Sequence, residues 1–286
     1  MPEIQQRPQD FRLLERIPIT REDVNEILPI RLAEPEQGER THQIVFLDTE
    51  TTGFDPLTDK IIELGMVRAT FAYDRRVLLS IDRVFQEFED PKGPIPERIT
   101  EITHITDDMV RGKEFNMDAV TQVLAGRPLV IAHNAKFDRP FFDRRFAILD
   151  NLSWGCSQEI DWMKAGSQSG KLEYLTMYRG WFYEAHRACV DCLALAWLMH
   201  IEPDALGLVC DRAITPEYKL TLRGNTFDIK DRIKAMGFKF DGTQKVWHKT
   251  FRDERSMRLE LESIGQFYDA GQAEIEQISA KNRYKR

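Results

Sequence analysis

The stretch QIVFLDTETTG occupies residues 43–53 and decides how the chain is expected to fold. Its four apolar residues, 44–47, run without interruption, which is typical of a strand buried on both faces of a sheet. Asp48 and Glu50 end this strand, and alternation along an extended chain places them on the same side. Two unpaired carboxylates repel each other, so a divalent cation is their natural partner. Taken by itself, however, the D-x-E pattern more often belongs to solvated surface carboxylates.

The residues that follow predict an α/β fold with a mixed sheet flanked by helices. Two apolar stretches, 61–71 and 77–88, are separated by polar residues and indicate two more strands, so that the sheet begins with three antiparallel strands. Further along, apolar spacing and turn residues predict a helix over 107–124, a strand over 128–132, a helix over 136–149, a short strand over 154–157, short helices over 159–164 and 171–178, and a long apolar helix over 185–199. The later strands are expected to be parallel to the first.

The length of 286 residues indicates one large domain with smaller additions. We expect an N-terminal extension over 1–41, an α/β domain over 42–205 and a small α+β module over 217–286. Thr20, before Val24 and Ile27, predicts a helix start in the extension. The alternative for this segment is a tail that merely packs on the surface.

The composition excludes disorder as the main state of the chain. Hydrophobic residues make up 42% and charged residues 30%, close to the average of globular proteins. No apolar run approaches the ~20 residues of a membrane span, and the first thirty residues lack the pattern of a signal peptide. The sequence therefore predicts a cytoplasmic protein without a membrane partner, whose four cysteines are too few for a disulfide scaffold.

Charge is distributed unevenly along the chain. Residues 1–216 carry 25 Lys and Arg against 36 Asp and Glu, whereas residues 217–286 carry 15 against 11. The net charges are therefore −11 and +4. An acidic body is an unusual partner for nucleic acid unless its carboxylates hold metal ions.

Two more segments carry residues suited to chemistry. HNAKFD, residues 133–138, directly follows a predicted strand and opens a helix, which is where sites form in α/β sheets. In it, Asn134 is equally suited to cap the helix, and Asp138 lies near the helix start. HRACVD, residues 186–191, begins the long apolar helix, and taken separately its His186 and Asp191 more often serve as a helix cap and a surface charge.

Cys189 and Cys192 form a C-x-x-C beside His186. A zinc or redox site is not the favoured interpretation, because a second pair is missing and the spacing falls inside a predicted helix. The simpler interpretation is that both cysteines are small, buried core residues with free thiols.

Together these segments resemble the DEDDh exonuclease family and, within it, the proofreading (epsilon) subunits of bacterial DNA polymerase III. DTETTG at 48–53 with KIIELG at 60–65 is similar to the first motif of the family, HNAKFD to the second and HRAxxD to the third, in the same order. A weaker similarity, TEITHITDDMV at 100–110, falls where the family has a substrate-side loop. The resemblance covers residues 42–201 and implies a ribonuclease H-like fold, in agreement with the predicted strand order.

The resemblance also implies a mechanism. Two divalent ions, Mg²⁺ or Mn²⁺, would be held by four carboxylates and would clamp the attacking and leaving oxygens at phosphorus. By resemblance the ligands are Asp48, Glu50, Asp138 and Asp191, and His186 is the general base. Bound cations would also reverse the local field that a phosphate meets.

The same resemblance names substrate contacts and an activity. Thr51 would hydrogen-bond the terminal nucleotide and Phe54 would wedge against its base, and three further contacts would be His104, Asn134 and Phe137. The implied activity is 3′ to 5′ hydrolysis at single-stranded or frayed DNA ends, with a polymerase or another DNA-processing protein as a possible partner. The alternatives are an exoribonuclease of the same fold acting on short RNA, and a binding subunit that recruits a polymerase or end-processing complex.

The C-terminal module is expected to be a helix over 228–236, stopped by Gly237, then a hairpin of strands 238–240 and 246–248 and a helical segment from 254. It weakly resembles the HARP repeats of annealing helicases. Its interleaved cations and aromatics suit a nucleic-acid surface, with six proposed contacts at Lys230, Arg232, Lys234, Lys239, Lys245 and Lys249. The alternative is that Phe238, Phe240 and Trp247 form the core of the module.

Overall fold

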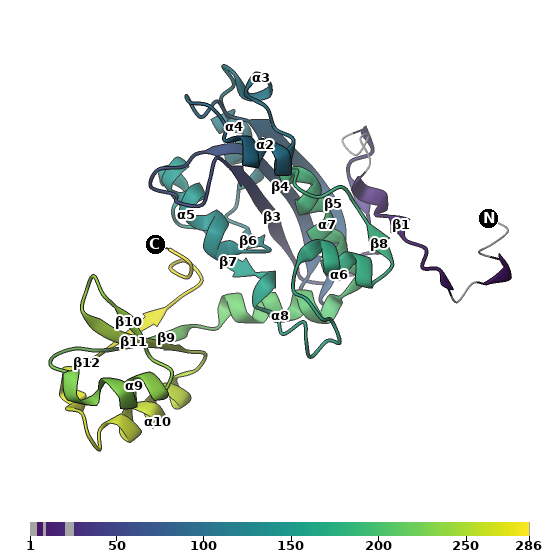
Figure 1. Cartoon of the computed structure of the whole chain (residues 1–286). Helices are drawn as coiled ribbons and strands as arrows, with labels where there is room; N and C mark the ends of the chain where they lie inside the picture. Colours follow the sequence, from purple (N-terminus) through teal and green to yellow (C-terminus); the bar gives the residue numbers. More distant parts are fainter. Residues whose placement is uncertain (1–4, 8–9, 21–25, 286) are drawn as a thin grey trace. The chain divides into compact units, whose positions relative to one another are not determined.

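The computed structural model describes residues 5–7, 10–20 and 26–285 (Figure 1). The chain divides into two compact units, one of Met1–Cys210 with Tyr284–Arg286 and one of Asp211–Arg283. Helix α8 (Pro203–Ile214) belongs to both, so the boundary expected at residue 205 falls inside a helix.

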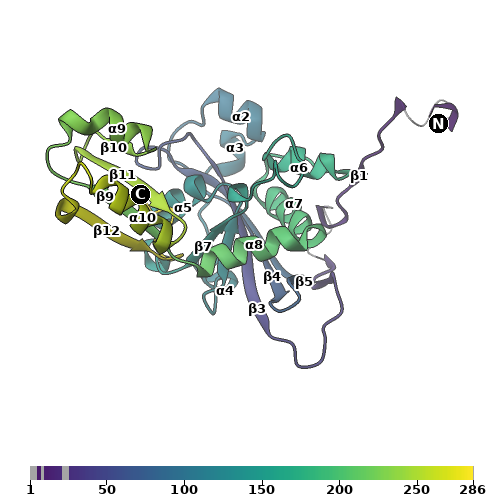
Figure 2. The same ribbon diagram turned by 90° about the horizontal axis from the view of Figure 1, so that it is seen from below.

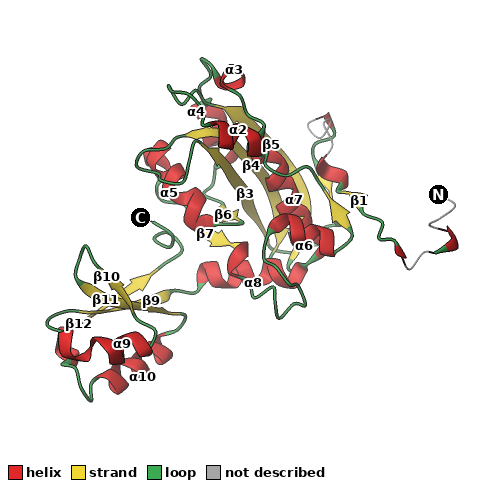
Figure 3. Cartoon of the chain, viewed as in Figure 1, coloured by secondary structure: helices red, strands yellow, loops and turns green. Residues whose placement is uncertain are grey.

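A six-stranded mixed sheet forms the centre of the first unit (Figure 3). Its strand order is β2-β5-β4-β3-β6-β7, with β2 (Ile30–Arg31), β5 (Val77–Phe88), β4 (Ile61–Ala72), β3 (Thr41–Thr51), β6 (Leu129–Ala132) and β7 (Ser153–Cys156). Strands β3, β4 and β5 are antiparallel neighbours, whereas β6 and β7 continue the sheet in parallel. The predicted fold class, a ribonuclease H-like mixed sheet flanked by helices, is confirmed.

Strand β3 is buried on both sides because the apolar run of residues 44–47 alternates between two cores. Ile44 and Phe46 pack with helix α7 (Ala188–Ile201) on one face. Val45 and Leu47 pack on the other face, against α4 (Met117–Val123) and α5 (Ala135–Arg145). The helices therefore cover both faces of the sheet, with α7 lying along β3, β4 and β5 (Figure 2).

The helix predicted over 107–124 is wrong. The structure has two short helices there, α3 (Asp107–Val110) and α4, because Gly112 between them adopts a left-handed conformation with φ 70°. The helix predicted over 159–164 is also wrong, since a 3-10 turn, η5 (Ser157–Glu159), and loop residues take its place. Two further short helices lie in the described part of the unit: α2 (Glu97–Thr103), which was not predicted, and α6 (Leu172–Tyr178), which was predicted. The unit also contains the 3-10 turns η2 (Pro18–Thr20) and η4 (Ala147–Leu149).

The N-terminal extension is part of the fold of the first unit. Strand β1 (Glu15–Arg16) pairs in parallel with β8 (Trp181–Phe182), and β2 joins the sheet beside β5. Ile17 and Ile19 are buried in the core on the α7 side. The helix predicted after Thr20 falls on residues 21–25, outside the described residues.

The second unit is a four-stranded antiparallel sheet with two helices. The strand order is β10-β11-β9-β12, and the elements are β9 (Glu217–Leu222), η6 (Phe227–Ile229), α9 (Lys230–Ala235), β10 (Lys239–Asp241), β11 (Val246–Phe251), α10 (Glu254–Ile264), η7 (Ala270–Gln272) and β12 (Ala273–Ile278). The predicted hairpin is present, whereas β9 and β12 were not predicted. Phe238 lies in the core, Trp247 packs partly against it and Phe240 is 53% exposed. The alternative prediction, that these aromatic residues form the core of the module, is therefore confirmed for Phe238 and wrong for Phe240.

Within the described residues, no single helix is long and apolar enough to cross a bilayer. Helices α7 and α8 pass that test only as a pair, and they are bent by 105° where they meet.

Candidate active site

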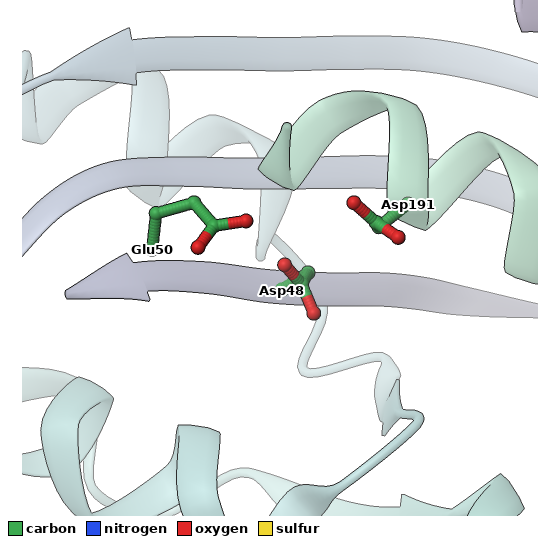
Figure 4. A group of neighbouring side chains, drawn as sticks. All are labelled: Asp48, Glu50 and Asp191. Atoms are coloured by element: carbon green, nitrogen blue, oxygen red, sulfur yellow. The ribbon is translucent and has the colours of Figure 1, made fainter. Parts of the chain in front are cut away.

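The end of strand β3 brings two carboxylates to the α7 face of the sheet. Asp48 and Glu50 continue the alternation of Ile44 and Phe46, so their side chains share one face of the sheet, as the spacing predicted. In the structure this face is the one that helix α7 covers. One oxygen of each lies within 4.8 Å of an oxygen of Asp191, which stands on α7. Figure 4 shows the three carboxylates pointing toward one another between β3 and the first turns of α7. Residues more than 140 positions apart in the sequence thus form one acidic cluster.

Helix α7 comes this close to the sheet because residue 65 is a glycine. Gly65 pairs with Asp48 across β3 and β4. A Cβ at this position would lie 2.3 Å from both the Ala188 carbonyl carbon and the Cys189 nitrogen of α7. Any larger residue would push the helix off the strand, and with it Asp191.

Two hydrogen bonds fix the orientation of the Asp191 carboxylate. The Tyr183 hydroxyl donates to Oδ1 at 3.0 Å, and the backbone N–H of Arg187 donates to Oδ2 at 3.1 Å. Tyr183 is buried, and burial raises the pKa of its phenol, so the hydroxyl remains a donor at neutral pH. The predictions missed Tyr183, because no spacing rule connects it to Asp191.

Asp138, the fourth carboxylate, lies in the first turn of α5 and is 2% exposed. The backbone N–H and Oγ1 of Thr49 donate to its Oδ1, at 3.1 and 2.9 Å. Asp138 is not one of the three residues whose oxygens converge within 4.8 Å, but its charge is the largest electrostatic influence on the pKa of Asp48. It therefore borders the cluster from the α5 side.

The cluster is electrostatically unfavourable without a cation. Burial raises the pKa of Asp48 well above its usual range, and Asp138 adds to this effect. Burial, followed by repulsion from Asp191, raises the pKa of Glu50 to about 8. Burial likewise raises the pKa of Asp138 to about 7 and that of Asp191 to about 6. Hard oxygen donors that resist ionisation in this way are suited to divalent cations, whose charge removes the repulsion.

His186 lies immediately before α7, exposed to solvent, with a left-handed backbone at φ 68°. Its positive charge, when present, lowers the pKa of Asp191, so the imidazole is close to the cluster.

The predicted substrate residues divide into two groups. Phe54 is 76% exposed, and its ring meets that of Phe137 edge to face at 6.2 Å. Thr51 is buried and donates from Oγ1 to the Gly53 carbonyl at 2.6 Å. Thr51 therefore ends β3, Phe54 lies on the loop that follows, and Phe137 stands on α5 beside Phe54.

Asn134 and His104 occupy helix ends. Asn134 is the N-cap residue of α5, but its side chain makes no capping hydrogen bond. His104 is exposed and caps the C-terminus of α2 with φ 58°. No described contact joins His104 to the acidic cluster.

His133, the first residue of the second motif, is held within the fold by hydrogen bonds at both ring nitrogens. Its Nδ1 is 2.9 Å from Ser157 Oγ and its Nε2 is 2.7 Å from the Gly170 carbonyl oxygen. Burial lowers its pKa to about 4, so the ring is neutral.

The cysteines of the C-x-x-C are buried and unbridged. Burial raises the pKa of Cys189 to about 12 and that of Cys192 well above its usual range, and Cys192 donates from Sγ to the Gly65 carbonyl at 3.3 Å. Protonated thiols of this kind are poor zinc ligands and poor redox centres.

In the second unit, five of the six proposed nucleic-acid contacts are exposed: Lys230, Arg232, Lys234, Lys239 and Lys245. Two of them lie over aromatic rings, Lys230 over Phe227 at 4.3 Å and Arg232 over Phe267 at 3.8 Å. Lys249 is different, because its Nζ donates to the Met236 carbonyl at 2.7 Å and pairs with Glu260 at 2.5 Å. Lys249 thus serves the packing of its own unit.

Comparison with known proteins shows related sequences. The family model described as Exonuclease (RNase_T) matches residues 45–199, more than half of the chain. A DNA polymerase III of PolC type from Lacticaseibacillus paracasei is 32% identical over 178 residues, which cover 59% of this chain and 12% of the relative. The PolC-type polymerase from Clostridium perfringens is 38% identical over 104 residues, covering 36% of this chain and 7% of the relative. The chain thus spans about an eighth or less of the length of these curated relatives.

Two solved exonuclease structures also resemble part of this chain. Exonuclease X in complex with 5′ overhanging duplex DNA has 22% identity and a TM-score of 0.43, covering 58% of this chain and 92% of that one. E. coli Exonuclease I in complex with a dT13 oligonucleotide has 16% identity and a TM-score of 0.49, covering 64% of this chain and 49% of that one.

Proposed function

Because the chain belongs to the RNase_T exonuclease family, we propose that it is a metal-dependent exonuclease that hydrolyses phosphodiester bonds at the 3′ ends of single-stranded or frayed DNA. The observation that carries this proposal is the convergence of Asp48, Glu50 and Asp191, with Asp138 beside them. A chain with a purely structural role has no need to gather four carboxylates in a place where burial raises the pKa of each, with repulsion from neighbouring carboxylates adding to this effect at Asp48, Glu50 and Asp138.

The donor set fits divalent cations. All four side chains offer carboxylate oxygens, the ligands that Mg²⁺ and Mn²⁺ prefer. We assign Asp48, Glu50, Asp138 and Asp191 as the residues that would hold two such ions. When bound, these ions would lower the pKa of the attacking water and stabilise the charge of the phosphate oxygens.

The remaining steps fall to residues of the chain itself. The imidazole of His186 takes the proton from the water that attacks phosphorus, while the bond from phosphorus to the 3′ oxygen of the penultimate nucleotide breaks and that oxygen gains a proton from solvent. Tyr183 and the Arg187 N–H hold the Asp191 carboxylate in place, and Thr49 holds Asp138. Phe54 and Phe137 offer an exposed aromatic pair on which a terminal base stacks regardless of its identity.

We assign the small basic module to substrate binding. Its net charge of +4 contrasts with the −11 of residues 1–216, and its exposed cations interleave with aromatic rings. A polymerase partner and a cytoplasmic location remain predictions from the sequence.

The test is a time course on matched DNA and RNA oligonucleotides labelled at the 5′ end, with Mg²⁺, Mn²⁺ or EDTA. We expect a metal-dependent ladder that shortens from the 3′ end, faster on DNA. A faster RNA ladder would convert the proposal to an exoribonuclease, because the pocket would then accept a 2′-hydroxyl. No cleavage of either polymer would contradict an exonuclease function and favour a binding subunit.

A further inference from the structure

Glu63 is a completely buried carboxylate that lies beside the acidic cluster without belonging to it. It is 0% exposed and stands on β4, inside the apolar run of residues 61–67. We propose that Glu63 is a positioning residue: together with Arg187 it fixes the N-terminus of α7, and thereby the place of Asp191 relative to Asp48 and Glu50. This inference rests on the proposed function of the cluster, whose geometry it explains.

The register of the sheet places Glu63 on the face that carries the cluster. Glu50 and Glu63 are direct cross-strand partners in the β3 and β4 pair, and Asp48 is paired with Gly65. Directly opposite residues of an antiparallel pair share one face. Glu63 therefore points to the same side as Glu50, toward helix α7.

Hydrogen bonds to the chain occupy both carboxylate oxygens of Glu63. Oε1 accepts from Arg187 Nη2 at 2.9 Å and from Gln86 Nε2 at 2.5 Å. Oε2 accepts from Arg187 Nε at 3.2 Å and from the backbone N–H of Ala188 at 3.1 Å. A carboxylate engaged by four donors has little capacity left for a cation, which separates Glu63 from its neighbour Glu50.

The same contacts connect Glu63 to Asp191. Arg187 is the N-cap residue of α7 and Ala188 is its first helical residue, so Glu63 engages the start of the helix through a side chain and a backbone N–H. The backbone N–H of Arg187 in turn donates to Asp191 Oδ2. A continuous path thus runs from β4 through the start of α7 to one of the three converging carboxylates. Residues of this kind orient the metal ligands without touching the metal, and removing them commonly lowers metal affinity.

The test is Glu63→Gln, which preserves the shape of the side chain but removes the charge that holds the guanidinium. The first readout is Mn²⁺ binding by titration calorimetry, and the second is the separation of kcat from KM on a single-stranded DNA oligonucleotide. We expect Mn²⁺ affinity to fall by about 10- to 100-fold and kcat to fall with it, while KM changes little.

The matched control is Glu89→Gln. Glu89 forms a bidentate pair with Arg145, with contacts of 2.7 and 2.6 Å, and its side chain is 15% exposed. Breaking this pair removes a comparable interaction from the same unit, so thermal stability should fall similarly while Mn²⁺ affinity stays at the wild-type value. If Glu63→Gln does not fold, Arg187→Lys keeps the charge but loses the forked geometry, and it should weaken Mn²⁺ binding in the same direction.

The outcomes separate this inference from the proposed function. A folded Glu63→Gln variant that binds Mn²⁺ as tightly as the wild type overturns the positioning role, even if the wild type is an active nuclease. Equal loss of Mn²⁺ affinity in Glu89→Gln also overturns it, because the effect would then follow from stability alone. A third outcome is that Glu63→Gln binds Mn²⁺ more weakly than the wild type while the wild type cleaves neither DNA nor RNA. This outcome supports the positioning role and contradicts the nuclease function.

Discussion

Thr49 holds Asp138 by two hydrogen bonds to a single carboxylate oxygen, one from its backbone N–H and one from its hydroxyl. Thr49 stands between Asp48 and Glu50 in the sequence but faces the opposite side of the sheet, where α5 packs. Strand β3 therefore supplies Asp48 and Glu50 on one face of the sheet, and through Thr49 on the opposite face it also holds the carboxylate of Asp138. The acidic cluster is assembled around this one strand.

Asp48→Ala should abolish cleavage while leaving the fold intact. Asp48 is central to the cluster, and its own raised pKa shows that its charge is unfavourable in the metal-free protein. Nuclease assays and circular dichroism check both parts, with Asp118→Ala on the exposed surface of α4 as the control. Wild-type activity in Asp48→Ala would exclude the metal site proposed here.

His186→Ala should lower the rate of the chemical step by about 100- to 10,000-fold, the range typical of a general base. Single-turnover kinetics on a short oligonucleotide measures this step separately from binding. His42→Ala is the matched control, since His42 is exposed at the opposite end of β3. If only KM changes in His186→Ala, the imidazole binds substrate and does not move the proton.

Metal-free protein should lose stability as the pH rises from about 4 to 8. The folded-state pKa values of about 6 for Asp191, about 7 for Asp138 and about 8 for Glu50 lie above those of an unfolded chain. The stabilisation from protonation is complete below the unfolded value near 4 and disappears as the pH passes through the folded values.

Because protons and cations compete for the same oxygens, the stabilisation by Mg²⁺ should grow over this pH interval. Thermal unfolding from pH 4 to 8.5, with Mg²⁺ or EDTA, measures both trends. Asp138→Asn should flatten the curve in EDTA. A stabilisation by Mg²⁺ that did not depend on pH would show that these carboxylates are not its ligands.

Gly65→Ala should lower the free energy of unfolding by at least about 1–3 kcal/mol. The added methyl group would collide with the backbone of α7, which cannot move aside unless the whole helix moves. Denaturant unfolding measures the loss, and Mn²⁺ affinity should fall with it because Asp191 moves. Gly93→Ala is the control, since a Cβ there has no atom within 4 Å. A Gly65→Ala protein as stable as the control would contradict the close contact of strand and helix.

Replacing Lys234, Lys239 and Lys245 together by Ala should weaken binding of single-stranded DNA and flatten its salt dependence. If all three contact phosphates, the slope of log K against log salt should fall by about 2, at roughly 0.7 for each contact. Fluorescence anisotropy over a salt series measures this slope. Substituting Lys92, Lys113 and Lys164 of the first unit removes the same charge, and an equal effect of the two sets would argue against a dedicated binding module.

Local patterns predicted the parts of the site that depend on neighbouring residues. The apolar run of 44–47 and the spacing of Asp48 and Glu50 follow from alternation along one strand, and the structure shows both. The convergence of Asp191 on this pair was implied by resemblance alone, because spacing along the chain does not say which strand a helix crosses. That contact depends on Gly65, whose role becomes visible only when α7 is in place.

Other features were missed because their partners are distant in the sequence. Glu63 interrupts an apolar run, and this was a signal that a buried charge needed a partner, but Arg187 could not be identified as that partner from the sequence. Strand β12 alternates at Ala273 and Ile275, yet its pairing with β9 crosses about fifty residues. In the helix predicted over 107–124, the periodicity concealed the break that Gly112 imposes.

The pairing of β1 with β8 has a consequence for the synthesis of the chain. Glu15 and Arg16 leave the ribosome early, but their partners Trp181 and Phe182 are made near the end of the first unit. At translation rates of about 5 to 20 residues per second, the N-terminal strand waits roughly 10 to 30 s for its partner. Ile17 and Ile19, buried in the finished core together with residues of α7, lack part of their native cover throughout this interval, which favours aggregation of the nascent chain until β8 and α7 emerge.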